Sequence, residues 1–552
     1  MGILLLILLL IVLFAFAVLK RHPKVPLIDL QNIKPSRVSE NFYTIKNNWI
    51  RKNAHGLWEM YVEGDPYERG VMNGILASEL IYNQEKFFVA EIRKKVPNPL
   101  YLYFLKLMVA WMNRKLNFYV GKEYNQEIYG VSQSASQEYS FIGPRYIRIL
   151  NYHAAHDIGH TLQYMNFVGC TSFAAWDNKT LDGKLIHGRN FDFHAGDEFS
   201  EEKIVTFYKP TTGSQFAMIT WGGMVGTVSG MNIHGITVTV NAAKSKLPMK
   251  SSTPITILVR EMLQYAETLK EAIEIADKRK IFVSESIHVS SGKENKSVLI
   301  EKTPYQSAIY SPDGPQLICT NHFQSEKLKN DPSNLQQIEE NSSMKRYQRM
   351  QELMERYDTL SVQSAVGILR DRLGTGDKPL GSGNEIAVNQ LIAHHSIIFK
   401  PAELKMWICC GPYTLGEYLC YDLNTVFNST ETLSSTFNII TEEENISKDE
   451  LLDNGGYADY MRFKEIRMLL KEKDASTEEQ NKWMLEMISL NPDSYLSYSE
   501  AGDLQMKQRN YKDALAYYNT ALQKRIPTKQ EEDHIRKGIA FCNKKLDQAN
   551  AA

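Results

Sequence analysis

The sequence predicts an α+β fold in which stacked sheets are covered by helices. Its 552 residues are 43% hydrophobic and 23% charged, a globular composition. A chain of this length is enough for about two to four domains. At Cys170 the pattern changes from helical to strand-like. The strand groups that follow alternate with stretches of helical period, an order typical of layered sheets with helices outside.

The chain begins with an apolar segment. Residues 2–19 are uncharged and overwhelmingly apolar, a length at the lower end for a helix that crosses a bilayer. The segment lacks a basic n-region, so we interpret residues 1–22 as a membrane anchor in preference to a removed signal, the other reading staying open. Lys20 and Arg21 would place the rest of the chain in the cytoplasm. Proteins of this layout often act outside it, and we favour an extracytoplasmic catalytic domain.

Residues 23–169 are predicted to form a helical prosegment. A polar lead-in over residues 23–50 precedes a largely helical region that runs to about residue 165. Within that region, residues 100–111 are strongly apolar and aromatic, but they are too few for a second membrane span. We expect a core helix or a membrane-surface helix there.

Residues 170–425 are predicted to form the catalytic domain. A hairpin is expected where two strand-like runs flank residues 178–183, which end in glycine. Helical period returns over residues 255–279 and 345–372. The other expected strands are 204–208, 216–221, 226–230, 235–241, 287–289, 297–301, 308–310, 395–399 and 405–410.

The C-terminal part is predicted to be a polar linker, residues 426–460, followed by a helical tail, residues 461–552. Six tail residues fall close to the tetratricopeptide spacing: Gly502, Tyr511, Ala514, Tyr518, Ala521 and Pro527. A single such unit cannot bury its faces alone, so we expect the tail to pack on a neighbouring part of the chain. The tail is also a candidate surface for a protein partner.

Charge and cysteine content exclude several functions. Lys and Arg number 63 against 64 Asp and Glu, and a net charge of −1 gives no general attraction to nucleic acid. The six cysteines show no CxxC pair and no zinc-ligand spacing. His153, His156 and His160 offer a weak metal-dependent alternative, because Asp157 stands where the helical zinc motif needs glutamate. We expect neither a metal nor another cofactor.

Cys170 is the candidate nucleophile. It follows Gly169 directly, and Arg189 and Asp192 come after an expected turn. This is the layout of a cysteine that becomes a new chain N-terminus, whose own α-amine, with a reference pKa of about 8, then serves as the base. A thiol attacks only as the thiolate, so a cation and a carboxylate are needed beside it. Arg189 and Asp192 supply them.

The remaining candidates would bind the developing oxyanion or support the site. Asn241 ends an expected strand, Asn321 lies in the run Cys319-Thr-Asn-His-Phe, and Arg346 opens an expected helix. Ordinary roles stay open for every candidate. Cys170 would then be a core cysteine, Arg189 and Asp192 a surface ion pair, the two asparagines turn residues and Arg346 a solvated helix residue.

Several short motifs, taken in order, resemble one family. They are Gly64-Asp-Pro-Tyr-Glu-Arg-Gly70 with Gly74, Gly169-Cys170-Thr-Ser, Gly188-Arg-Asn-Phe-Asp192, Gly230-Met-Asn-Ile-His-Gly235 leading to Asn241, Thr320-Asn-His-Phe323, and Ser343 through Arg346. Over residues 60–425 the chain resembles the acyl-coenzyme A:6-aminopenicillanate acyltransferase-like hydrolases of the N-terminal-nucleophile superfamily. Choloylglycine hydrolases and acid ceramidase are more distant relatives of the same kind.

The resemblance implies a four-layer αββα N-terminal-nucleophile core. It implies self-cleavage between Gly169 and Cys170 by an N-to-S acyl shift, with the prosegment retained as the smaller chain. Cys170 then forms an acyl-thioester that water or an amine resolves. The residues it implies are Cys170 as nucleophile, Arg189 and Asp192 beside it, Asn241 and Asn321 as the oxyanion hole, and Arg346 as support.

The predicted function is therefore a self-processing cysteine hydrolase or acyltransferase. Its substrate would be a small-molecule linear amide or thioester of an acyl group, and an apolar acyl chain fits a membrane-tethered enzyme. The alternative is a catalytically silent, membrane-anchored interaction module that recruits partners through its helical tail. The presence of Cys170, Arg189 and Asp192 together favours the enzyme, because a silent fold has no need of all three.

Overall fold

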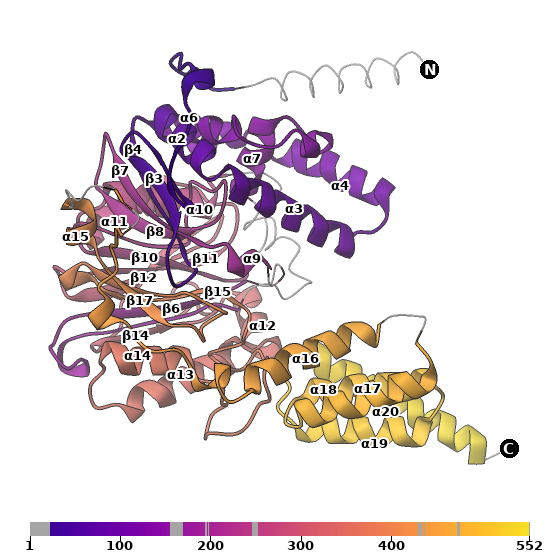
Figure 1. The fold of residues 1–552 in the computed structure, drawn as a ribbon. Helices are drawn as coiled ribbons and strands as arrows, with labels where there is room; N and C mark the ends of the chain where they lie inside the picture. The colour runs from indigo at the N-terminus through magenta and orange to yellow at the C-terminus, as the bar shows by residue number, and fades with distance from the viewer. Residues whose placement is uncertain are drawn as a thin grey trace.

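The computed structural model describes residues 22–154, 169–193, 196, 198–245, 252–428, 433–434, 436–471 and 475–550. The chain folds into a mixed α+β body with two sheets, followed by a run of helices (Figure 1). The predicted α+β class is therefore confirmed. The proposed membrane anchor lies outside the described residues except for His22. No helix from residue 22 onward, in the ranges given above, is long and apolar enough to cross a membrane.

The larger sheet has eleven strands in the order β1-β2-β3-β4-β7-β8-β9-β10-β11-β12-β13. Its strand pairs are antiparallel except β4 and β7, which run parallel. The strands are β1 (Ser36–Ser39), β2 (Phe42–Ile45), β3 (Asn48–Lys52), β4 (Trp58–Gly64), β7 (Ile204–Pro210), β8 (Phe216–Thr220), β9 (Ser229–Asn232), β10 (Ile236–Ala242), β11 (Glu285–Ser291), β12 (Lys296–Lys302) and β13 (Ser307–Tyr310).

The smaller sheet has six antiparallel strands in the order β14-β5-β6-β15-β16-β17. The strands are β5 (Thr171–Ala175), β6 (Ile186–Asp192), β14 (Gln316–Cys319), β15 (Ala393–Lys400), β16 (Lys405–Cys409) and β17 (Tyr418–Asp422). Strands β5 and β6 form the predicted hairpin, with the 3-10 helix η4 (Asp177–Lys179) in its turn. Strands β14 and β17 were not expected from the sequence.

Apolar side chains fill the space between the two sheets and both outer faces. Between the sheets, residues of the larger one meet residues of the smaller one: Val205, Phe207, Ala217 and Ile219 with Ile397, Phe399, Met406, Ile408 and Leu419. The outer face of the larger sheet packs on helices α2, α6, α10 and α11, and that of the smaller sheet on α13 and α14. The helices of this body beyond residue 170 are α9 (Glu198–Glu201), α10 (Ile255–Tyr265), α11 (Leu269–Lys278), α12 (Pro332–Glu340), α13 (Ser343–Arg356), α14 (Val362–Leu369) and α15 (Leu423–Asn428).

The prosegment is not wholly helical. Residues 36–64, expected as a polar lead-in and the start of a helical region, form β1–β4 at one end of the larger sheet. Their partner strand β7 follows much later in the chain, and this pairing stabilises strands that local periodicity does not reveal. From residue 66 on the expected helices appear: α2 (Pro66–Leu76), α3 (Ser78–Lys95), α4 (Pro99–Met112), α5 (Leu116–Val120), α6 (Lys122–Ser132) and α7 (Arg145–His153).

Glycines let α2 and α6 touch along their backbones. A Cβ at Gly70 would lie 2.0 Å from the carbonyl oxygen of Glu127, and one at Gly130 would lie 2.6 Å from that of Tyr67. Only glycine fits such an approach. The glycine of the predicted prosegment motif therefore serves helix packing.

Helix α4 has no buried residue. The expectation of a core helix over residues 100–111 is wrong, because this helix extends away from the sheets together with α3 (Figure 1). Its exposed side chains include Leu100, Tyr101, Tyr103, Phe104, Leu107, Met108 and Trp111. The membrane-surface reading stays a prediction.

The segment expected to be a linker is in part packed against the smaller sheet. Ile446 exchanges two backbone hydrogen bonds with Tyr418 of β17, and the N–H of Thr441 donates to the carbonyl of Cys420. Two short 3-10 helices, η6 (Glu442–Glu444) and η7 (Glu450–Leu452), follow. The polar composition of this stretch thus does not correspond to a free connection.

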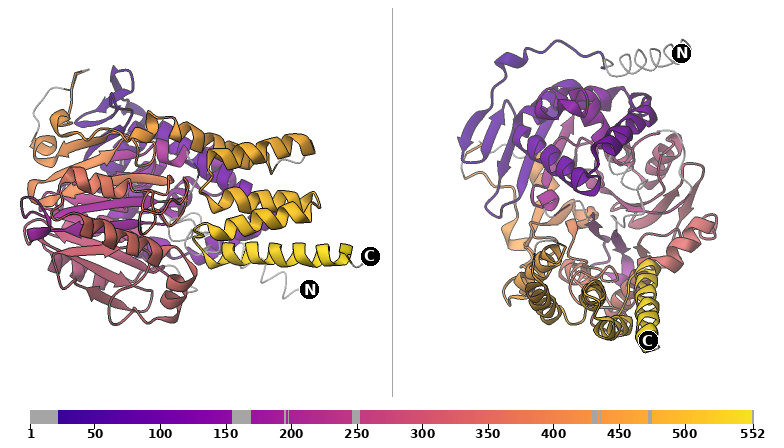
Figure 2. Two further views of the ribbon diagram at one scale, coloured as in Figure 1. Left: turned by 90° about the horizontal axis from the view of Figure 1, so that it is seen from below. Right: turned by 90° about the vertical axis from the view of Figure 1, so that its right-hand side faces the viewer.

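The tail is helical, as expected, and extends from the body with its helices side by side (Figure 2, left). It contains α16 (Gly456–Leu469), α17 (Thr477–Leu490), α18 (Tyr495–Lys507), α19 (Tyr511–Gln523) and α20 (Lys529–Asn550). Ala514, Tyr518 and Ala521 are fully buried. The Tyr518 ring lies against Gly502 and Gly538, where a Cβ would approach it within 2.7 and 2.6 Å. Assignment of these helices as tetratricopeptide repeats stays a prediction.

Candidate active site

The β5–β6 hairpin brings the first candidate residues together. Ser172 pairs with Arg189 across the two strands, and Thr171 pairs with Asn190. Just beyond the hairpin ends, the N–H of Gly169 donates to the carbonyl oxygen of Asp192 at 3.1 Å. Cys170 therefore sits beside the end of the strand that carries Arg189 and Asp192. All three side chains are fully buried, so the reading of a surface ion pair is wrong.

Arg189 contacts the thiol directly. Its Nη2 lies 3.6 Å from Sγ of Cys170. The rest of the guanidinium is held by the carbonyl of Val228 at 2.9 Å, by the carbonyl of Val240 and by the hydroxyl of Ser229. Guanidinium groups stay charged in proteins, so the site holds a fixed cation beside the sulfur.

Burial nevertheless raises the pKa of the Cys170 thiol to about 11. The charge of Arg189 acts in the opposite direction, while Asp192 and Glu285 raise the pKa further. Because only the thiolate attacks, the thiol needs a base at neutral pH. In the continuous chain the nitrogen of Cys170 is an amide and cannot be that base.

Asp192 is a buried carboxyl group with an unusual environment. Its Oδ2 accepts a hydrogen bond from Nε2 of Gln390 at 3.2 Å, whereas Oδ1 has no hydrogen-bond partner among the described residues. Burial raises its pKa to about 7, and the charges of Arg346 and Arg189 oppose this. A carboxyl group that titrates near neutrality is a common feature of catalytic sites.

Asn241, Asn321 and Arg346 lie in three different segments that converge on the same region: β10, the bend after β14, and α13. Asn241, in β10, accepts a hydrogen bond from the hydroxyl of Ser172 at 3.2 Å. Nη2 of Arg346 donates to Oδ1 of Asn321 at 2.5 Å. Burial lowers the pKa of Arg346, and the opposing effects of Asp192 and Cys170 place this cation in the field of the site. All three residues are buried, so the reading of Arg346 as a solvated helix residue is wrong.

Each asparagine donates one amide hydrogen to a backbone carbonyl. Nδ2 of Asn241 donates to Cys319 at 3.1 Å, and Nδ2 of Asn321 donates to Ala242 at 2.9 Å. An amide NH2 has two hydrogens, so these bonds orient the groups and leave one donor each for another acceptor. The reading as strand-end turn residues does not account for these links between elements.

Gln390 is a site residue that no sequence motif indicates. It belongs to no motif and is separated from Cys170 by most of the catalytic domain. It is 2% exposed and donates to both Asp192 and the carbonyl oxygen of Gly169. Ser229 and His395, which hydrogen-bond to each other at 2.8 Å beside Arg189, were missed for the same reason.

The histidine cluster gains no support as a metal site. Both ring nitrogens of His153 are engaged, one with the carbonyl of Ile149 and the other with the N–H of Val225. His156 and His160 lie outside the described residues. Within the described ranges, no group of three or more His, Cys, Asp or Glu side chains is placed to hold a metal ion.

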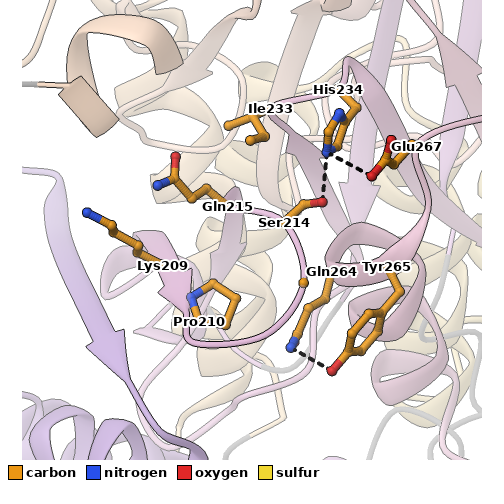
Figure 3. A pocket seen from close by; sticks show the side chains of 10 residues that line it. Lys209, Pro210, Ser214, Gln215, Ile233, His234, Gln264, Tyr265 and Glu267 are labelled. Carbon is orange, nitrogen blue, oxygen red and sulfur yellow. Dashed lines mark hydrogen bonds and ion pairs between the residues drawn. The ribbon is translucent and has the colours of Figure 1, made fainter.

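A surface pocket of about 560 Å³ lies where β7 and β9 end (Figure 3). Its walls include Lys209, Ser214, His234 and Glu267. None of the predicted site residues lines it. Its residues therefore play no part in the arrangement around Cys170.

Comparison with known proteins supports the family resemblance for part of the chain. Residues 178–413 match the family model described as acyl-coenzyme A:6-aminopenicillanic acid acyl-transferase. The match covers less than half of the chain and begins after Cys170, so it includes Arg189 and Asp192 but not the candidate nucleophile. The predicted resemblance is confirmed over this stretch.

Curated relatives are similar at the level of distant homologues. An uncharacterised protein of Archaeoglobus fulgidus is 27% identical over 262 residues, which are 44% of this chain and 43% of the relative. The N-acylethanolamine-hydrolyzing acid amidase of Caenorhabditis elegans is 25% identical over 268 residues, 47% of this chain and 70% of the relative. The chain thus spans less than half of the length of the archaeal relative.

Solved structures were also matched. The Caenorhabditis elegans N-acylethanolamine-hydrolyzing acid amidase ortholog shows 19% identity and a TM-score of 0.31, covering 42% of this chain and 93% of the other. A mutant conjugated bile acid hydrolase from Clostridium perfringens shows 11% identity and a TM-score of 0.32, covering 49% and 97%.

Proposed function

We propose that this chain is a self-processing cysteine amidohydrolase or acyltransferase with an N-terminal-nucleophile core of four layers. The observation that carries the proposal is the buried group of Cys170, Arg189 and Asp192, assembled directly at the Gly169–Cys170 peptide bond. A buried arginine against a thiol is costly unless its charge is used or compensated. A silent interaction module gives no reason for this arrangement.

In the proposed reaction, cleavage before Cys170 frees its α-amine. That amine has a reference pKa of about 8 and takes the thiol proton when Sγ attacks the acyl carbon of an amide. Arg189 stabilises the thiolate, and Asp192 orients the ammonium group that forms. The free amide hydrogens of Asn241 and Asn321 bind the oxyanion.

The leaving amine then departs with the proton, and Cys170 carries the acyl group as a thioester. Attack by water gives hydrolysis, and attack by an amine gives acyl transfer. Amides of apolar acyl chains are the proposed substrates, and N-acylethanolamines, named for the nematode relative, are the first to test. The proposed apolar N-terminal anchor would place the site near such lipids.

The test is release of fatty acid from an N-acylethanolamine by the wild-type chain and by Cys170→Ala. We expect the variant to lose the activity completely. Cys409→Ala is the matched control, because Cys409 is an equally buried cysteine and lies in β16 of the sheet whose strand β5 follows Cys170. A Cys170→Ala form that hydrolyses the amide as fast as the wild type would end the proposal.

A further inference from the structure

Gln390 holds the carbonyl group of the peptide bond that is proposed to break. Its Nε2 donates to the oxygen of Gly169 at 2.7 Å and to Oδ2 of Asp192 at 3.2 Å. The amide NH2 has two hydrogens, so both bonds can form at once. One side chain therefore joins the carbonyl oxygen before Cys170 to the carboxyl group beside the thiol.

The contact explains why glycine stands at position 169. A Cβ there would lie 2.6 Å from Nε2 and 2.8 Å from Oε1 of Gln390. Any larger residue must push the amide away from the carbonyl oxygen. The glycine before the nucleophile thus leaves room for the Gln390 amide at this carbonyl oxygen.

Hydrogen bonds fix the backbone on both sides of Gln390. The carbonyl of Val388 accepts a hydrogen bond from Nδ2 of Asn190 at 3.0 Å, and Oδ1 of Asn389 accepts from the N–H of Leu391 at 3.1 Å. Asn190 lies in β6 between Arg189 and Asp192, so the loop of Gln390 is tied to the strand that carries the site. A fixed backbone limits how far the Gln390 amide must reorganise when charge develops on its acceptor.

We propose that Gln390 is the oxyanion donor for self-cleavage, an inference that rests on the proposed function. Sγ of Cys170 bonds to the carbonyl carbon of Gly169, and the carbonyl oxygen becomes an oxyanion bound by Nε2 of Gln390. The carbon–nitrogen bond then breaks. The thiol proton moves to the nitrogen of Cys170, with the carboxyl group of Asp192 as its carrier, and a thioester and a free amine result.

Water then hydrolyses the thioester, which gives the carboxylate of Gly169 and restores the thiol. The donor for this first step differs from those proposed for substrate turnover, Asn241 and Asn321. The self-cleavage site and the substrate site thus share the nucleophile but use separate oxyanion donors. Loss of Gln390 is expected to leave the chain folded and largely uncleaved.

The experiment follows cleavage of the full chain during cell-free synthesis, by denaturing gel and intact mass. Gln390→Met keeps the length of the side chain and removes the donor. We expect its cleavage to be about 10²-fold slower than that of the wild type, the usual effect of losing one oxyanion donor. Gln264→Met, the same change at another fully buried glutamine, is the matched control and should cleave at the wild-type rate.

The outcomes separate the two proposals. If the wild type is cleaved before Cys170 and Gln390→Met is cleaved equally fast, Gln390 is not the donor, while the proposed function stands. The Cys170→Ala variant should stay whole. If the wild type also stays whole, the proposed function and the role of Gln390 both fail. Should Gln390→Met not fold, Gly169→Ala gives a second test. Its methyl group displaces the amide, and cleavage at the wild-type rate in this variant would overturn the inference.

Discussion

Two influences act on the Cys170 thiol in opposite directions: the charge of Arg189 lowers its pKa, and burial raises it. Arg189 supplies a positive charge at 3.6 Å from the sulfur, and burial keeps the thiol pKa at about 11 in the uncleaved chain. The thiol therefore stays protonated and unreactive until a base is present. The proposed cleavage would create that base on the same residue, and activity would then depend on processing.

Arg189→Lys is expected to reduce kcat/KM on an acyl amide by about 10²-fold or more, because an ammonium group cannot reach the thiol and the carbonyls of Val228 and Val240 together. The rate of Cys170 alkylation as a function of pH checks the physical reason. It should report a higher thiol pKa in the variant than in the wild type. An unchanged thiol pKa would mean that Arg189 does not act on the sulfur.

Asp192 gives a prediction about stability and pH. Its pKa is raised to about 7 in the folded chain, above an unfolded value of about 3.9. The folded state therefore binds more protons between these values, and this contribution to stability is complete below about pH 4 and lost as the pH rises through 7. In a Cys170→Ala background, Asp192→Asn should reduce the fall in Tm between pH 5 and 8.

The control for this experiment is Asp313→Asn, which changes an exposed carboxylate. It should leave the slope of Tm against pH as it was. If Asp192→Asn also leaves the slope unchanged, the buried carboxyl group does not titrate in this range.

At the residue scale, the sequence was informative where chemistry is concentrated in short motifs. Cys170, Arg189 and Asp192 lie within one hairpin, and local spacing was enough to group them. Gln390 lies in a segment with no motif, far from Cys170 in sequence. The pairing of β15 with β6 brings this segment to the site. Sequence spacing carries no signal for such a contact.

At the scale of helices and strands, the pairing of β4 with β7 joins the prosegment to the catalytic domain. β4 and β7 pair in parallel over seven residue pairs, although they lie on opposite sides of the proposed cleavage site. Strands β1–β4 would therefore remain part of the larger sheet after cleavage. These strands were not expected from the sequence because their partner lies in the other part of the chain, whereas the β5–β6 hairpin, which is local, was predicted.

A buried ion cluster strengthens the same junction. Glu127 of α6 contacts Arg69 of α2 at 2.5 Å and Arg260 of α10 at 3.4 Å, with all three side chains fully buried. Burial would raise the pKa of Glu127, but the two arginines hold it below its usual range. Removal of one partner would leave an uncompensated buried charge, which lowers the free energy of unfolding.

Arg260→Met should therefore lower the free energy of unfolding by about 3–5 kcal/mol, as for other broken buried ion pairs. Denaturant unfolding of a Cys170→Ala background gives the value. The exposed pair Arg536–Glu532 in α20 supplies the control, since Arg536→Met should cost only about 0–1 kcal/mol. Equal effects of the two changes would contradict a stabilising role for the cluster.

On the scale of the whole molecule, the tail packs against the segment that leads to Gln390. Asn491 exchanges hydrogen bonds of 3.0 Å with the backbone N–H and carbonyl of Ser382. Nδ2 of Asn384 donates to the carbonyl of Arg525. The sequence predicted that the tail must pack on a neighbour, but it contained no indication of which surface.

Asn491→Ala is expected to lower the free energy of unfolding by about 1–3 kcal/mol, because the N–H and carbonyl of Ser382 lose their partner in a half-buried setting. Amide hydrogen exchange should become faster over residues 380–392. Asn438→Ala, which changes an exposed asparagine near η6, is the control. Unchanged exchange over 380–392 would show that the tail does not order this segment.

The central claim is that Cys170 becomes an N-terminal nucleophile. The most direct measurement is the intact mass of purified wild-type chain beside Cys170→Ala, with a denaturing gel of both. The account predicts two chains for the wild type, one ending at Gly169 and one beginning at Cys170, and a single uncleaved chain for the variant. A wild-type chain that is folded and still continuous across this bond would contradict it.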